Sequence, residues 1–107
     1  MYNYFMLMGR LVKDPEVKEL AEGKRVMNIR IAVTRGFQNA NGEYDTDFFN
    51  IAFWDYLIDY TVDNLKKGQP VLIKGRMQTT KEEHAKGFQI TYPTLIGERI
   101  MFFNHSS

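Results

Sequence analysis

The chain has 107 residues, of which 44% are hydrophobic and 25% charged, and its net charge is +1. This size and composition predict a single soluble domain whose core needs no covalent cross-links. The lack of cysteine excludes disulfides and thiolate metal sites and fits a reducing, cytoplasmic compartment. No apolar run is long enough to span a membrane, and no signal-peptide pattern opens the sequence.

The first half of the sequence alternates apolar and polar residues with the period of β-strands. The first predicted strand covers residues 2–12, and Gly9 within it indicates a bend or bulge. The second covers residues 25–35 and the third residues 47–54, and Asn39-Ala-Asn-Gly42 between them has the composition of a hairpin turn. This half of the chain is therefore expected to be β-sheet.

One helix is predicted, over residues 55–67. Asp55 can cap its first turn, and Gly68 suits the position just after its end. Its apolar stripe consists of Leu57, Ile58, Val62 and Leu65.

Two further strands complete the chain. The fourth covers residues 70–78 and contains Gly75, and a polar hairpin loop is predicted at residues 81–87. The fifth, residues 88–103, is interrupted by a proline and a glycine, so we expect it to bulge or to run along an edge there.

Three strands, a helix and two strands, with glycine bends in strands one and four, follow the order of an OB-fold, a five-stranded Greek-key barrel. We therefore predict an all-β protein with this fold and with one helix between strands three and four. An SH3-like or other small barrel is the alternative, and the position of the helix favours the OB-fold. The domain is expected to cover residues 1–103, followed by a short disordered end at residues 104–107.

The phase of the third strand indicates a functional surface. Phe49, Ile51 and Phe53 share one face, and the opposite face contains an amide and a small residue, which makes it the solvent side. That solvent side also carries Phe48 and Trp54. Large rings exposed on a sheet indicate a partner, although the helix or a neighbouring subunit could also cover them.

The basic residues favour a polyanionic partner. Three segments predicted as strands or strand ends, residues 2–13, 25–35 and 69–81, contain cations but no aspartate or glutamate. In the second strand, Met27, Ile29, Ile31 and Val33 point one way and Arg30 lies on the opposite, polar face. Phe37 lies just past that strand. Stacking rings flanked by cations are typical of proteins that bind single-stranded nucleic acid.

The sequence offers little support for catalysis. His84 falls in a predicted loop and His105 in the tail, and the only serines stand at the C-terminal end. Glu82-Glu83-His84 and Asp45-x-Asp47 could hold a metal ion, but such short clusters are usually polar turn residues. The sequence shows no general base with an orienting partner and no glycine-rich phosphate loop. We expect a protein without enzymatic activity, metal or cofactor.

Four blocks of the sequence carry a resemblance to a known family. They are Gly9-Arg-Leu-Val-Lys-Asp-Pro-Glu16, Ile31-Ala-Val-Thr-Arg-Gly-Phe37, the run from Asn39 to Asn50 with Phe53-Trp54, and Leu65-Lys-Lys-Gly68 followed by Val71–Thr79. In this order and spacing, the chain resembles the bacterial single-stranded DNA-binding protein family over essentially its whole length. The resemblance implies an OB-fold that binds single-stranded DNA.

The resemblance also implies roles for particular residues. The family's stacking aromatics correspond to Phe37, Phe48 and Trp54. The predicted phosphate contacts are Arg10, Arg30, Arg35, Lys67, Lys74, Arg76 and Lys81. Arg30 is included because it lies on the polar face of the second strand, and the others stand at or near the family's cationic positions. Members pair their first strands and usually form tetramers as dimers of dimers. The interface here would lie in residues 2–8, with Tyr2, Tyr4, Met6 and Met8.

Two departures from the family pattern matter. Glu82 and Glu83 stand where some members carry a further stacking aromatic, so the hairpin loop at residues 81–87 is left out of the predicted site. The chain also stops at Asn104-His-Ser-Ser107, without the flexible linker and acidic tip through which members recruit proteins. It is either cut there or a tailless relative, and tail-mediated partners are not expected.

The leading hypothesis is a sequence-tolerant single-stranded DNA-binding protein that protects the strand in replication, recombination or repair, in the cytoplasm at the nucleoid. The alternative is an OB-fold interaction subunit of a replication-restart complex, with its aromatic face buried against protein. A nuclease or an RNA binder on the same barrel is a third hypothesis.

Overall fold

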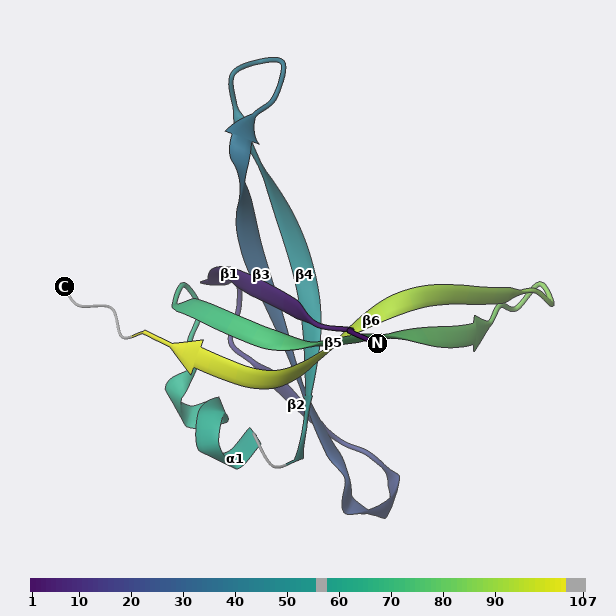
Figure 1. Cartoon of the computed structure of the whole chain (residues 1–107). Coiled ribbons are helices and arrows are strands. Elements are labelled where there is room, and N and C mark those ends of the chain that lie inside the picture. Colours follow the sequence, from purple (N-terminus) through teal and green to yellow (C-terminus); the bar gives the residue numbers. More distant parts are fainter. Residues whose placement is uncertain (56–57, 104–107) are drawn as a thin grey trace.

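The computed structural model describes residues 1–55 and 58–103, which form a closed β-barrel with two long projecting hairpins (Figure 1). The barrel strands are β1 (Phe5–Leu11), β3 (Arg25–Gln38), β4 (Tyr44–Trp54), β5 (Pro70–Glu83) and β6 (Gln89–Phe102). They follow the order β1-β5-β6-β4-β3, and β3 pairs back with β1 to close the ring. The predicted all-β OB-fold is confirmed.

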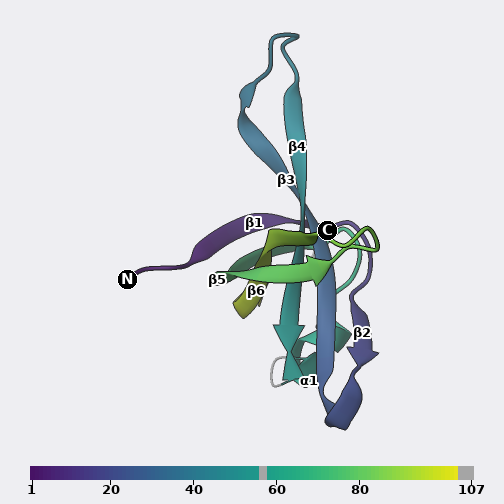
Figure 2. The same ribbon diagram turned by 90° about the vertical axis from the view of Figure 1, so that its right-hand side faces the viewer.

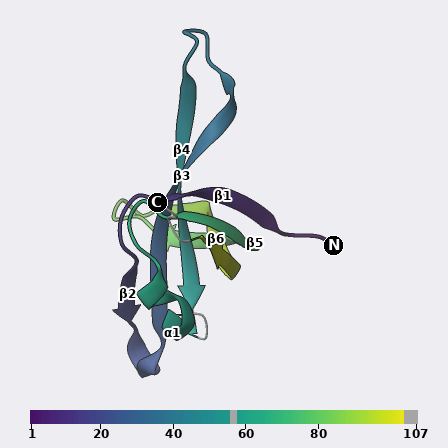
Figure 3. The same cartoon turned by 90° about the vertical axis from the view of Figure 1, so that its left-hand side faces the viewer.

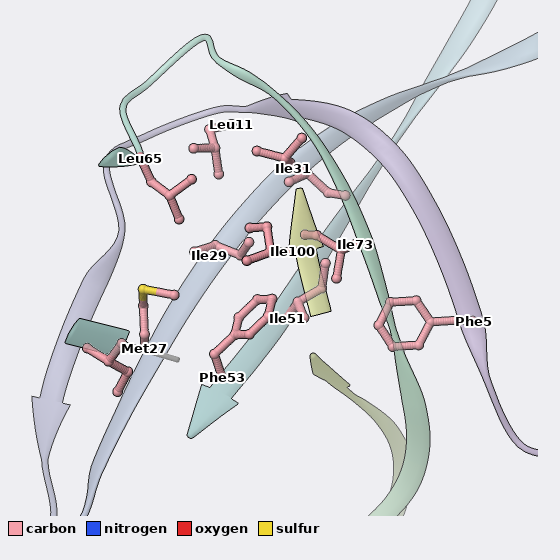
Figure 4. Close-up of a cluster of buried hydrophobic side chains, with 12 residues drawn as sticks. Phe5, Leu11, Met27, Ile29, Ile31, Ile51, Phe53, Leu65, Ile73 and Ile100 are labelled. Carbon is pink, nitrogen blue, oxygen red and sulfur yellow. The ribbon is translucent and has the colours of Figure 1, made fainter. Parts of the chain in front are cut away.

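The inward faces of these strands fill the barrel (Figure 4). Met27, Ile29 and Ile31 of β3 alternate with outward residues, and Ile51 and Phe53 of β4 do the same; each of the five is at most 1% exposed. Burying one such side chain contributes about 1.5–3 kcal/mol. The strand phases predicted from the sequence are therefore confirmed for both strands.

The predicted glycine bends lie where strands approach one another closely. β5 and β6 shift register between Lys74 and Gly75, where Gly75 pairs with Gly97. A Cβ at Gly97 would collide with the Phe53 ring, and a Cβ at Gly9 would collide with the carbonyl oxygen of Ala32. These glycines allow the sheet to bend tightly around the core.

A short strand missed by the sequence analysis, β2 (Glu16–Glu19), pairs with the beginning of β3. The chain returns from β2 to β3 through η1 (Ala21–Gly23), where Glu22 and Gly23 have φ angles of 69° and 75°. All residues of β2 are exposed. An edge strand without a buried face leaves no hydrophobic alternation in the sequence, which explains the omission.

The helix ends earlier than the predicted residue 67. Within residues 58–103 it comprises α1 (Ile58–Thr61) and η3 (Val62–Asn64), and Leu65 is already extended, with φ −105° and ψ 126°. β-branched residues and asparagine at its end have low helix propensity, which accounts for the early stop. Ile58 and Leu65 of the predicted stripe are buried in the core, whereas Leu57 lies outside the described residues.

The β3–β4 hairpin projects from the barrel as one arm (Figures 1 and 2). Its predicted turn is confirmed: the Gly42 N–H donates to the Asn39 carbonyl over 3.0 Å, and the φ angle of Gly42 is 78°. The Asn39 side-chain oxygen accepts from the N–H groups of Asn41 and Glu43. Both strands are longer than predicted because their pairing continues up to this turn.

The β5–β6 hairpin forms a second arm that leaves the barrel in a different direction (Figures 1 and 3). β5 continues to Glu83, so the predicted loop at residues 81–87 shrinks to a tight turn. The His84 N–H donates to the Phe88 carbonyl over 2.8 Å, and the φ angle of Gly87 is 87°. The predicted disordered end, residues 104–107, lies outside the described residues.

Candidate nucleic-acid interface

The outward face of β4 carries four residues that we call the β4 row: Phe48, Asn50, Ala52 and Trp54. They stand opposite Ala32, Arg30, Asn28 and Val26 of β3. Residues directly opposite one another in a sheet share a face. Phe48 is 51% exposed and Trp54 39% exposed. Both rings are therefore open to solvent, on the face that the strand phase predicted.

Phe37, the third predicted stacking residue, lies apart from the β4 row. It belongs to the distal part of β3, within the register shift between Thr34 and Gln38. Its ring is 65% exposed. The β3–β4 arm therefore holds Phe37 near its tip, whereas Phe48 and Trp54 lie on the barrel half of the same hairpin.

Arg30 is part of the aromatic surface. Its guanidinium carbon lies 5.1 Å from the centroid of the Phe48 ring, within the range of a cation–π contact. Its Nη1 also donates to Oδ1 of Asn50 over 3.1 Å. The guanidinium thus lies over the ring instead of extending into solvent.

Arg76 shares the face of the β4 row although it comes from a distant strand. Ala52 pairs with Ile96 of β6, and Ile96 pairs with Arg76 of β5. Asn28 of β3 pairs with Ala52 from the other side. Asn28, Ala52, Ile96 and Arg76 therefore form one line across four strands, with Arg76 at its end. The Arg76 guanidinium donates to the side chain of Gln78 over 2.7 Å.

Arg10 approaches the β4 row from the opposite direction. It pairs with Ala32 of β3, which in turn pairs with Phe48. Two strand spacings amount to about 10 Å, so a cation at Arg10 lies within reach of a strand stacked on Phe48. Its Nη1 donates to the Gly68 carbonyl over 3.1 Å, which fixes part of the guanidinium.

The three predicted lysines lie farther away. Lys74 precedes the bend in β5, pairs with Met6 of β1, and has its ammonium 6.0 Å from the Tyr4 ring centroid. Lys81 is exposed on the β5–β6 arm. Lys67 is exposed in the loop after η3, where its backbone N–H donates to Asp14. The fold does not gather these cations around the β4 row.

Arg35 is paired with two carboxylates of the neighbouring strand β4. Asp47 receives two hydrogen bonds from its guanidinium, at 2.9 and 3.0 Å, and Asp45 lies 3.7 Å away. These hydrogen bonds lower the pKa of Asp47 and raise that of Arg35. Residues 25–35 contain no acidic residue of their own, but the β3–β4 register sets Asp47 opposite Val33 and so brings a carboxylate to Arg35.

Lys18 is a candidate that the sequence analysis missed. It pairs with Val26, which stands opposite Trp54, so Lys18 shares the face of the β4 row at its Trp54 end. Its side chain is exposed. Only the presence of β2 reveals this position, since nothing in the local sequence distinguishes it from a loop lysine.

The predicted interface residues of the N-terminal segment lie on another face. Tyr2, Tyr4, Met6 and Met8 are between 59% and 95% exposed. A hollow of about 450 Å³ beside Met6 is lined also by Lys74 and by Leu72, Arg99 and Met101. The outward surface of β1, β5 and β6 is thus largely apolar and open in the single chain.

The two sequence clusters considered for metal binding do not form a site. Across residues 1–55 and 58–103, no group of three or more histidines, aspartates or glutamates is arranged to hold a metal ion. Asp45 and Asp47 contact Arg35 instead, and the His84 ring stacks on Phe88 with centroids 4.5 Å apart. In the same part of the chain, no helix is long and apolar enough to cross a membrane.

Comparison with known protein families gives a match over residues 2–103 to the family described as the single-strand binding protein family. The chain belongs to this family. The resemblance stated from the sequence blocks is thereby confirmed.

Individual relatives agree with this assignment. Single-stranded DNA-binding protein B of Bacillus subtilis is 33% identical over 104 residues, which are 97% of this chain and 92% of that protein. Single-stranded DNA-binding protein 2 of Listeria monocytogenes and protein A of Bacillus subtilis are each 34% identical over 102 residues. The chain spans only 64% and 59% of these two longer relatives.

A solved structure described as a Plasmodium falciparum SSB complex with ssDNA has the same architecture. It superposes with a TM-score of 0.79 at 26% identity, covering 97% of this chain and 96% of that one. The likeness therefore extends over the barrel and both arms.

Proposed function

We propose that this protein binds single-stranded DNA with little sequence preference, using the β4 row as its stacking surface. The observation that carries the proposal is the exposure of Phe48 and Trp54 on one sheet face. Arg30 lies over the Phe48 ring, and Arg76 lies in line with Ala52 across the sheet. Family membership and the ssDNA complex of a similar structure support it. The family is one of binding proteins, not of enzymes.

Stacking supplies most of the base contact in this proposal. Each base stacked on an aromatic ring contributes about 1–3 kcal/mol, and every base offers a flat face, so the contact tolerates any sequence. Phe48 and Trp54 hold bases on the barrel, and Phe37 takes a further base where the strand passes the β3–β4 arm.

Cations around the row contact the phosphates. Arg10 lies at one side and Arg76 at the other, and Lys18 extends the positive surface past Trp54. Arg35 joins them when a phosphate replaces Asp47 as its partner. Lys67, Lys74 and Lys81 serve a strand that continues around the molecule. Neutralised phosphates release counterions, so the affinity falls as the salt concentration rises.

The protein also assembles with itself in this proposal, as a dimer of dimers built on β1. Tyr4, Met6 and Met8 present an apolar surface, and exposed apolar patches of this kind mark interaction sites. The assembly lets one strand pass from barrel to barrel. The biological role is protection of single strands during replication, recombination or repair in the cytoplasm, at the nucleoid.

The decisive experiment is a fluorescence titration with oligothymidylate at low salt. Trp54 is the only tryptophan in the chain, so stacking on it must quench the intrinsic tryptophan emission. Absence of quenching would contradict the proposal and favour an interaction subunit that keeps its aromatic face for protein.

A variant pair tests the stacking residues themselves. Phe48→Ala combined with Trp54→Ala should remove most of the affinity, measured by fluorescence anisotropy of a labelled oligonucleotide because the tryptophan is gone. Phe103→Ala, which removes a ring 40% exposed away from the β4 row, is the matched control and should bind as the wild type does. Normal binding by the double variant would refute the stacking assignment.

A further inference from the structure

A groove opens between β4 and β6, beside the β4 row. The two strands pair in parallel at Ile51–Leu95 and Ala52–Ile96. They then diverge, because β4 joins the β3–β4 arm and β6 joins the β5–β6 arm (Figure 1). The space between them measures about 460 Å³, and its lining includes Phe48, Asn50, Met77, Tyr92, Pro93 and Leu95.

The groove and Arg30 lie on opposite sides of Phe48 along the sheet. Arg30 belongs to β3 and the groove to β6, and the strand order places β4 between them. The guanidinium lies over one face of the Phe48 ring, 5.1 Å from its centroid. We expect a flat group in the groove to stack on the remaining face, so that the cation supports the ring from the other side.

The chemistry of the groove is apolar with a polar rim. Met77 pairs with Leu95, and both line the groove together with Pro93. Asn50 also lines the groove, and its Oδ1 accepts a hydrogen bond from Arg30, so its amide N–H groups are the part of the side chain left to donate to a ligand. An aromatic ligand with an apolar edge and a carbonyl acceptor matches this arrangement.

We propose that the groove takes one nucleobase of the bound strand, which enters beside Phe48 with its apolar edge against Met77. The inference rests on the proposed single-stranded DNA binding. A base is the occupant because the groove shares the Phe48 wall with the stacking surface and lies on the same side of β4 as Arg76, which contacts the phosphates in the proposed function. Asn50 donates to a carbonyl oxygen of the base, and a methyl group at position 5 of a pyrimidine is buried against Met77.

If a base occupies the groove, the protein should distinguish between bases at this one position, although it binds the rest of the strand with little sequence preference. Thymine and uracil differ only by the 5-methyl group, so oligothymidylate and oligodeoxyuridylate of equal length isolate this contact on an identical backbone. Burying one methyl group corresponds to about a fourfold gain in affinity. Thymine methyl groups at other positions of the bound strand also raise the ratio of thymine affinity to uracil affinity. The test is therefore how much this ratio changes in a variant of the groove.

The experiment measures both affinities by fluorescence anisotropy for the wild type, for Met77→Ala and for Met101→Ala. Met77 and Met101 are 43% and 53% exposed, and Met101 lies on β6 away from the groove. We expect Met77→Ala to lower the thymine-to-uracil ratio about two- to fourfold through weaker thymine binding, and Met101→Ala to leave it unchanged. Tyr92→Ala, which removes another lining side chain from the same β5–β6 arm, should act like Met77→Ala and replaces it if that variant does not fold.

Two results would overturn the groove assignment while leaving the proposed function intact. One is an unchanged ratio in both groove variants, which is also the result expected if the groove receives a side chain of a partner protein. The other is an equal loss of affinity for both oligonucleotides, which would mean that Met77 only supports the surface. Failure of the wild type to bind either oligonucleotide would instead refute the proposed function.

Discussion

Arg30 and Phe48 form a diagonal pair across neighbouring strands, with the guanidinium carbon 5.1 Å from the ring centroid. Arg30 stands opposite Asn50 and donates to it, so the guanidinium is fixed at two points. The Arg30 guanidinium thus supports the ring on which a base stacks, whereas Arg76 is assigned to the phosphates. Arg30 and Arg76 should therefore affect binding in different ways when they are removed.

Arg76→Ala should weaken binding to every sequence and reduce the slope of log affinity against log salt by about one, because one phosphate contact is lost. Arg30→Ala should weaken binding with a smaller change in slope, because it disturbs stacking on Phe48. Anisotropy titrations at several salt concentrations measure both quantities. Equal slope changes in the two variants would show that Arg30 is simply another phosphate contact.

Asp47→Asn should tighten DNA binding, because it releases Arg35 and removes a negative charge beside the phosphate path. An exposed ion pair is a modest competitor, so the gain should reach at most about fivefold at low salt. Asp63→Asn makes the same charge change in η3 and serves as the control. Unchanged or weaker binding by Asp47→Asn alone would place Arg35 outside the interface.

The Arg35–Asp47 pair also predicts a pH dependence of stability. Arg35 lowers the pKa of Asp47, so the unfolded state binds a proton at higher pH than the folded state does. The stabilisation is fully present above the ordinary aspartate pKa and is lost as the pH falls through the lowered pKa of the folded state. Thermal unfolding of wild type and Asp47→Asn should therefore differ at neutral pH and converge in acid.

Met6→Asp combined with Met8→Asp should lower the mass of the particle in solution, because it places two charges in the proposed β1 interface. Analytical ultracentrifugation measures the mass, and circular dichroism checks the fold. Val17→Asp combined with Leu20→Asp adds the same charge to exposed apolar positions near β2 and should leave the mass unchanged. A full-sized assembly in the β1 variant would move the interface elsewhere.

Gly97→Ala should destabilise the barrel, because the added methyl group collides with the Phe53 ring in the core. Overpacking of this kind costs about 1–3 kcal/mol, and each kcal/mol lowers the melting temperature of a domain of this size by about 4–8 °C. Gly36→Ala is the control, since no heavy atom lies within 4 Å of its added Cβ. Equal melting temperatures for the two variants would show that the bend tolerates a side chain.

The side of each central strand that faces the core could be predicted from the sequence. Alternation is a local property, so it placed Met27 and Phe53 inside and Phe48 and Trp54 outside without knowledge of their neighbours. The turn at residues 39–42 and the glycine bends could also be predicted, because each depends on the backbone conformation of only one or two residues.

The contacts between side chains could not be predicted, because they depend on how distant strands pair. Asp47 reaches Arg35, Arg30 covers Phe48, and Lys18 joins the face of Trp54 through strand pairings between distant segments. β2 and the early end of the helix could not be predicted from the sequence either. An exposed edge strand and a short terminal turn are stabilised by the segments that they contact, which the local sequence does not show. Register across a barrel is a non-local property, since it is set by packing of the whole core.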